Sequence, residues 1–188
     1  MRADSDSQRG ESVGSPDQAR IARQKQWTQA ANERRLMAEA IGVDAHDILV
    51  ELQLVGYKAD TIVLLELAPA VDVAWADGRI SAREREVILQ LGARGCVVDG
   101  SFVYGHLNCW LDCPPSDHLF DASIRAIHAM LDTLQPDVRN ALRRKLVADY
   151  TAVALVSDSC VFGGAISNDE RRALDHIIAV LEHPGHSL

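Results

Sequence analysis

The sequence predicts an all-α protein, and three observations support that fold class. Apolar residues recur every three or four positions along most of the chain, which is the spacing of one helix face. Aromatic residues make up only 5% of the 188 residues, so small and branched aliphatic side chains must build the interior. No segment shows the clear alternation of a β-strand. With 47% hydrophobic residues, the chain is long enough to bury a core of its own.

The N-terminal third divides into a tail and a helical extension. Residues 1–17 are mostly polar and offer too little apolar surface to offset the entropy of ordering, which predicts a disordered tail. Residues 18–58 form the extension, in which one helix runs to about residue 40 and a second is capped by Asp44 and ends at Gly56. Trp27, on the first helix, is a candidate anchor for a partner protein, with burial as the alternative.

The main domain is expected to span residues 59–183, and it opens with a dense apolar run. Thr61 is the predicted N-cap of a central helix, and Pro69 is expected to kink that helix because it removes a backbone hydrogen bond. An Asp-Gly turn at Gly78 should end this segment. The next helix is then predicted to start at Ser81.

The second half of the domain reads as further helices. Residues 96–115 are consistent with one short helix between turns, and residues 116–134 carry apolar side chains at helical spacing. Pro136 suits the first position of a long helix that follows, since its missing N–H would have no partner there. The last helix is predicted to begin at Ser167, and residues 184–188 form a short tail.

Composition also limits the class of function. The net charge of −8 argues against nucleic acid as a partner, because phosphate binding needs a concentrated basic face, and it suits a cation instead. No apolar run is long enough to cross a bilayer and the N-terminus lacks a secretory signal, so we expect a cytoplasmic protein without direct membrane insertion. Four cysteines in such a chain indicate thiols rather than a disulfide framework.

Two parts of the chain repeat one pattern. The stretches "AWADGRISAREREVILQL" and "ALVSDSCVFGGAISNDERRALDHI" each hold a loop with glycine, an Ile-Ser pair and a Glu three residues after the Ser, namely Ser81 with Glu84 and Ser167 with Glu170. At these residues the chain resembles the TerB-like family, the small helical domain of tellurite-resistance proteins. The resemblance spans roughly residues 60–182 and implies a helical bundle with two pseudo-repeated helix-loop-helix halves.

The resemblance also implies that acidic residues beside the two loops bind a divalent cation. By motif position this role carries over to Asp77, Glu84 and Glu170. Three other carboxylates lie near these loops but match no position of the motif: Asp72, Asp158 and Asp169. The second loop departs from the Asp-Gly pattern, since two glycines stand where the first loop has Asp77 and its following glycine.

The first loop is similar to the second half of a calcium-binding EF-hand. Its first and third ligand positions would fall on Val73 and Trp75, which offer no side-chain oxygen, so a complete EF-hand is excluded. Calcium, the favoured ion, takes about six to eight oxygens, and Glu170 from the second loop is the expected supplementary ligand. A structural alternative is that the Ser and Glu of each loop are capping boxes, which leaves only Asp77 unexplained.

A second constellation contains four possible zinc ligands, His106, Cys109, Cys113 and His118, but their spacing matches no common zinc module and small core residues are the alternative. No group is identifiable that would orient a catalytic Cys or His, so we expect no enzyme. The sequence thus predicts a stress-response or tellurite-resistance protein that binds a divalent cation and an unidentified protein partner. The alternative is a helical protein-protein interaction module without metal.

Overall fold

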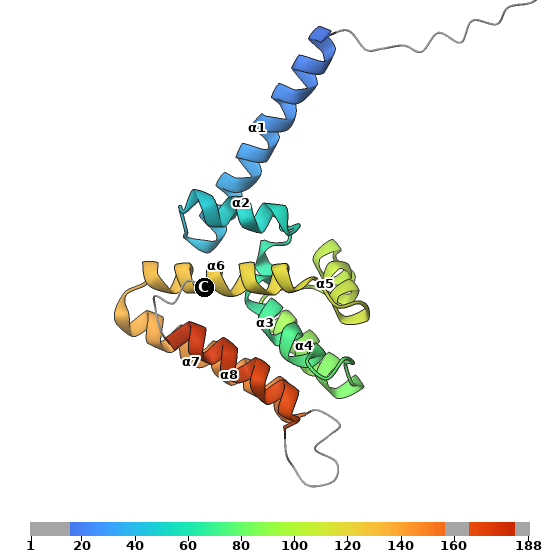
Figure 1. Ribbon diagram of the computed structural model, residues 1–188, viewed down its shortest axis with the longest axis vertical. Coiled ribbons are helices and arrows are strands. Elements are labelled where there is room, and N and C mark those ends of the chain that lie inside the picture. The colour runs from blue at the N-terminus through green and yellow to red at the C-terminus, as the bar shows by residue number, and fades with distance from the viewer. Residues whose placement is uncertain (1–15, 157–165, 183–188) are drawn as a thin grey trace, which may run out of the picture.

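The computed structural model describes residues 16–156 and 166–182, and all regular structure within them is helical (Figure 1). The all-α prediction is therefore confirmed for these residues. In the described part, no helix combines the length and the apolar character that crossing a bilayer requires. The elements are α1 (Pro16–Ile41), α2 (His46–Leu54), the 3₁₀-helix η1 (Ile62–Leu67), α3 (Ala68–Trp75), α4 (Ala82–Arg94), α5 (Phe102–Asp112), α6 (Asp117–Thr133), α7 (Pro136–Leu155) and α8 (Asn168–Glu182).

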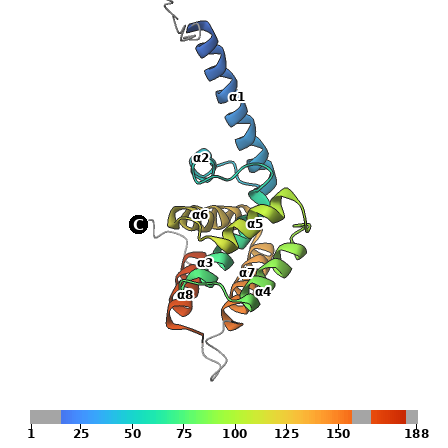
Figure 2. The same ribbon diagram turned by 90° about the vertical axis from the view of Figure 1, so that its right-hand side faces the viewer.

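The short helix α3 lies at the centre of the body and packs against α6, α7 and α8 (Figures 1 and 2). Six of its eight residues are buried, and apart from one proline these are alanines and valines. Small side chains let neighbouring helices approach closely on several sides of one short element. The largest fully buried side chains of the surrounding elements complete the core, among them Leu64, Leu107, Ile127, Leu146 and Tyr150.

The predicted central helix is in fact two helices. Residues 62–67 form the 3₁₀-helix η1, and α3 begins at Ala68 with Pro69 in its first turn. A proline at this position does not kink the helix. Backbone N–H groups in the first turn have no acceptor within the helix, so the missing N–H of Pro69 breaks no hydrogen bond. Thr61 makes no cap on η1; its hydroxyl accepts a hydrogen bond from the Lys58 N–H at 3.0 Å.

Several helix ends agree with the sequence, and one does not. Ser81 and Ser101 cap α4 and α5 by accepting backbone hydrogen bonds, and Pro136 occupies the first turn of α7. Gly56 takes the predicted left-handed conformation, with a φ of 105°. Asp44 does not cap α2, because the N-cap is Ala45 and makes no side-chain bond. The helix starts one residue too late for the Asp44 carboxylate to serve as cap.

The N-terminal helix α1 projects from the body as an arm (Figures 1 and 2). It begins at Pro16, inside the stretch predicted as a tail; residues 1–15 and 184–188 lie outside the described residues. Its C-terminal half is held by the amide of Gln53 on α2, which accepts from Arg34 Nη1 at 2.6 Å and donates to the Ala30 carbonyl at 3.2 Å. Helix α2 packs in turn on α6, which joins the extension to the body.

Candidate functional site

Both predicted capping boxes are present, at the starts of α4 and α8. The Ser81 Oγ accepts from the Glu84 N–H at 3.2 Å, while Glu84 Oε2 accepts from the Ser81 N–H at 2.7 Å. At α8 the Ser167 Oγ accepts from the Glu170 N–H at 3.1 Å, and Glu170 Oε2 accepts from the Ser167 N–H at 2.8 Å. Each box therefore satisfies two backbone N–H groups at the start of its helix, and the two boxes do so in the same way.

The two capping glutamates are buried, although a helix start usually faces water. Glu84 is 2% exposed and Glu170 is 0% exposed, and the two carboxyl groups lie within hydrogen-bonding reach of each other. Each uses Oε2 in its capping box. The remaining Oε1 atoms of both residues are buried and have no hydrogen-bond partner among the residues that the structure describes. An arrangement of this kind needs a proton, a cation or a water between the two carboxyls.

Electrostatics at this pair oppose two negative charges. Burial is the main cause that raises the pKa of Glu84 from 4.5 to about 7, and the neighbouring Glu170 carboxylate adds to the rise. The hydrogen bonds from Ser81 act in the opposite direction, because they stabilise the ionised form. Near neutral pH the Glu84 carboxyl is thus close to the point at which a proton and a metal ion compete for it.

Asp77 stands apart from the glutamate pair. Its Oδ1 accepts from the Arg79 N–H at 3.1 Å and its Oδ2 lies 3.8 Å from Arg79 Nε, so the carboxylate stabilises the turn that passes through Gly78, where φ is 87°. Within residues 16–156 and 166–182, no three His, Cys, Asp or Glu side chains converge as a metal-binding group. The fold thus brings Glu84 and Glu170 together, and Asp77 does not join them.

Of the other carboxylates near the loops, Asp158 lies outside the described residues. Asp169 is exposed and forms an ion pair with Arg172 at 3.1 Å. Asp72 was not assigned a role from the sequence, yet burial raises its pKa to about 6, with further contributions from Asp117 and Asp121. The signal for it was available, because it is the one charged residue in the apolar run of α3.

No protein-family model, curated protein or solved structure matches this chain. The resemblance to the TerB-like family rests on the loop residues alone and stays a prediction.

The four possible zinc ligands of the sequence do not converge within the described residues. The His106 ring packs against the Trp110 ring in an edge contact, with the centroids 5.4 Å apart. Cys109 and Cys113 are exposed thiols. The tryptophans differ in environment. Trp110 is buried, and its carbonyl accepts from the indole N–H of the half-buried Trp75 at 2.9 Å, whereas Trp27 is 75% exposed.

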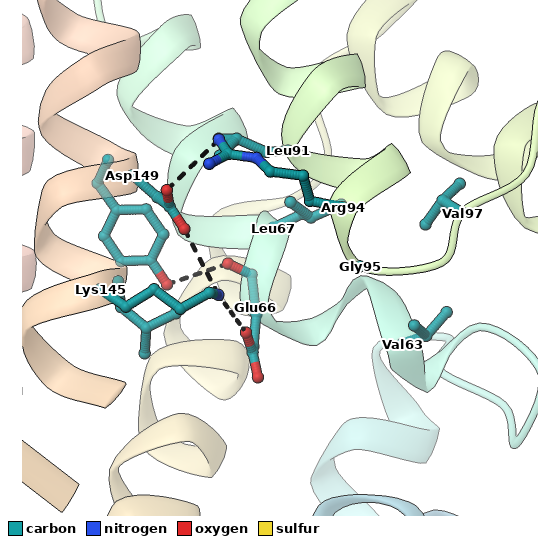
Figure 3. Close-up of a pocket in the computed structure, with 11 residues that line it drawn as sticks. Val63, Glu66, Leu67, Leu91, Arg94, Gly95, Val97, Lys145 and Asp149 are labelled. Carbon is teal, nitrogen blue, oxygen red and sulfur yellow. Dashed lines mark hydrogen bonds and ion pairs between the residues drawn. The ribbon is translucent and has the colours of Figure 1, made fainter. Parts of the chain in front are cut away.

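A cavity of about 100 Å³ lies between η1, the end of α4 and α7 (Figure 3). At its edge Lys145 Nζ lies 3.2 Å from a Glu66 oxygen and 3.5 Å from an Asp149 oxygen, and Arg94 reaches Asp149 at 3.6 Å. The Tyr150 hydroxyl donates to the Glu66 carbonyl at 3.0 Å. These charged side chains are paired with one another, so the cluster links α7 to η1 and α4. No unpaired charge among them remains to attract a ligand. The apolar lining comprises Val63, Leu67, Leu91, Val97 and Leu146.

Proposed function

We propose that this chain is a TerB-like, non-enzymatic stress-response or tellurite-resistance protein that binds a divalent cation between Glu84 and Glu170. One observation carries the proposal: the two buried Oε1 atoms, from helices far apart in the sequence, have no hydrogen-bond partner in the described part of the chain and belong to carboxyl groups in contact. A cation bound there neutralises both carboxylates and removes the cost of burying them.

The ligand set supports a cation that accepts oxygen ligands and keeps water. Each glutamate has one free oxygen, because the other stays in the capping box. Calcium and magnesium both accept carboxylate oxygens, and water or backbone carbonyls complete their coordination. Asp77 becomes a further ligand only if its carboxylate leaves the Arg79 N–H, so the proposal gives it a secondary role. The calcium preference remains part of the proposal.

Calorimetric titration tests the site directly. The full chain, stripped with chelator, is titrated with calcium, magnesium and manganese beside the double variant E84Q/E170Q. Glutamine can replace glutamate in a capping box, so the variant keeps both helix caps and loses both charges. We expect binding heat in the wild type and none in the variant. Absence of heat for all three ions at submillimolar concentrations would contradict the proposal.

Asp169→Asn is the matched control for this titration. Asp169 stands next to Glu170 in the first turn of α8, but it is exposed and paired with Arg172. Removing its charge tests whether general acidity of the loop attracts the ion. We expect the control to bind as the wild type does, and a loss of binding as large as in the double variant would move the site away from the buried pair.

The second candidate function is a protein-protein interaction module without metal. The arm α1 favours it, since this helix extends away from the body (Figure 2) and carries Trp27, whose side chain is 75% exposed. In this case Glu84 and Glu170 serve only as helix caps. The melting temperature of the wild type separates the two candidates: calcium raises it if the folded state binds the ion, and leaves it unchanged if the module is metal-free.

A further inference from the structure

The outer half of α1 is an exposed basic helix. Every residue from 17 to 29 is exposed, and both views show this half extending beyond α2 (Figures 1 and 2). It carries the cations Arg20, Arg23 and Lys25 against one carboxylate, Asp17, which pairs with Arg20 at 3.6 Å. Arg23 and Lys25 have no ion-pair partner among the described residues. A solvated helix segment of this length is marginally stable on its own, so a covering surface would stabilise it.

An edge of the body has the opposite charge. Asp117 and Asp121 are exposed and lie one turn apart at the start of α6, and α6 packs against α3, the helix that carries Asp72. Both carboxylates disfavour the ionisation of Asp72, and His176 on α8 opposes them. Asp117 and Asp121 form no ion pair within the described part of the chain. Their nearby cation, Arg125, is already paired with Glu51 on α2. We call Asp72, Asp117 and Asp121 the acidic edge.

The arm of one molecule cannot neutralise its own acidic edge. In both views α1 extends away from α3 and α8, on the far side of α2 and α6 (Figures 1 and 2). A second copy has no such restriction. We propose that the outer half of α1 in one copy docks on the acidic edge of a second copy, and that the exchange is reciprocal, giving a closed twofold dimer.

Size and chemistry define what kind of dimer this is. The exposed stretch of α1 is about 20 Å long at 1.5 Å per residue, so each contact is small and only the two together approach the area of a specific interface. Exposed charges dominate the contact, with Trp27 as its largest apolar side chain. The dimer is therefore weak and sensitive to ionic strength.

Sedimentation equilibrium of the full chain at several concentrations is the first test. We expect a dimer at low ionic strength whose dissociation constant rises by at least about tenfold as salt screens the contact. The inference is overturned if the wild type stays monomeric at low salt throughout the concentration series, or if the dimer is insensitive to salt. Binding to anionic vesicles or to duplex DNA by a protein that remains monomeric also overturns it, since the arm would then recognise phosphate.

Charge exchange between two variants is the sharper test. R23E/K25E makes the arm acidic, and D117K/D121K makes the edge basic, so each variant alone has arm and edge of like charge. We expect both to be monomeric. When they are mixed, both contacts of the mixed pair are again complementary, and a one-to-one heterodimer should form. Failure of the mixture to associate contradicts the inference.

Controls keep this test independent of folding. Arg23 and Lys25 are exposed on the outer half of α1, so R23E/K25E should leave the body intact. Circular dichroism checks D117K/D121K, and D117N/D121N replaces it if the helix start does not tolerate lysine; that variant should weaken wild-type dimerisation. K58E/R144E changes the net charge as R23E/K25E does, at exposed positions outside the arm and the acidic edge. It should dimerise as the wild type does.

Discussion

Glu84 and Glu170 begin two different helices, and their carboxyl groups meet in the interior although 85 positions separate them in the sequence. A capping glutamate ordinarily faces water, where its charge costs nothing. Here the same side chain closes a capping box with one oxygen and faces a second carboxyl with the other. The consequences for stability and for ion binding can each be measured.

The pH dependence of stability should report the pKa of Glu84. In the unfolded chain this carboxyl has a pKa near 4.5, and in the folded protein the pKa is about 7, so the folded state binds more protons between these values. Stability therefore falls as the pH rises through this window and levels off above it. Melting curves in chelator should show this fall in the wild type and a flatter profile in Glu84→Gln. The exposed Glu86→Gln on the same helix should keep the wild-type slope.

Asp72→Asn should raise the melting temperature near neutral pH. The ionised Asp72 is disfavoured by burial and by Asp117 and Asp121, which together raise its pKa from 3.8 to about 6. The gain should be absent at pH values below 3.8, develop between the two pKa values and stay constant above them. Thermal unfolding across this range measures it. Asp175→Asn, at an exposed position on α8, should give no comparable gain in melting temperature. An equal gain there would show that the effect arises from the change in net charge alone.

Calcium binding should release protons from the glutamate pair. Because a proton and a metal ion compete for the same Oε1 atoms, binding near neutral pH displaces up to about one proton, and fewer at higher pH. Titration in two buffers with different ionisation enthalpies measures this release as a difference in heat. Heats that do not depend on the buffer would place the ion away from Glu84.

Asp77→Asn should reduce the calcium-induced rise in melting temperature only if the first loop rearranges on ion binding.

Ser81→Ala and Ser167→Ala should each lower the free energy of unfolding by about 1 kcal/mol, because each removes a hydroxyl that accepts a helix N–H. Ser116→Ala is the matched control. Ser116 is the N-cap of α6 but makes no side-chain cap bond, so its loss should be smaller. Denaturant unfolding of the three variants gives the comparison. Equal losses at all three positions would show that the caps contribute nothing specific.

Local features of the fold were predictable from the sequence, because they depend on neighbouring residues. Ser81, Ser167 and Pro136 mark helix starts whose chemistry is complete within four residues. The break at Pro69 was predictable as a distortion but not as a change to a 3₁₀-helix. Whether residues 62–67 form a 3₁₀-helix or an α-helix depends on the packing of η1 against α4 and α6. Neighbouring residues in the sequence do not determine that packing.

The site was predictable only in part. The repeated pattern identified Glu84 and Glu170 as metal ligands, but it assigned the same role to Asp77. In the structure the Asp77 carboxylate instead accepts a hydrogen bond from the Arg79 N–H. Burial of the pair arises from how α4 and α8 meet, a long-range relationship that spacing alone cannot supply. The charge on Asp72 was visible in the sequence, whereas its acidic neighbours on α6 come close only in the folded chain.

The central position of α3 has a consequence for how the chain folds. Its partners α6, α7 and α8 all follow it in the chain, and the last of them ends at Glu182. During synthesis α3 leaves the ribosome long before the helices that cover it, and its contacts close large loops of chain. Folding of the body must therefore wait until α8 has been synthesised, and a nascent chain without α8 exposes an uncovered apolar helix to chaperones and proteases.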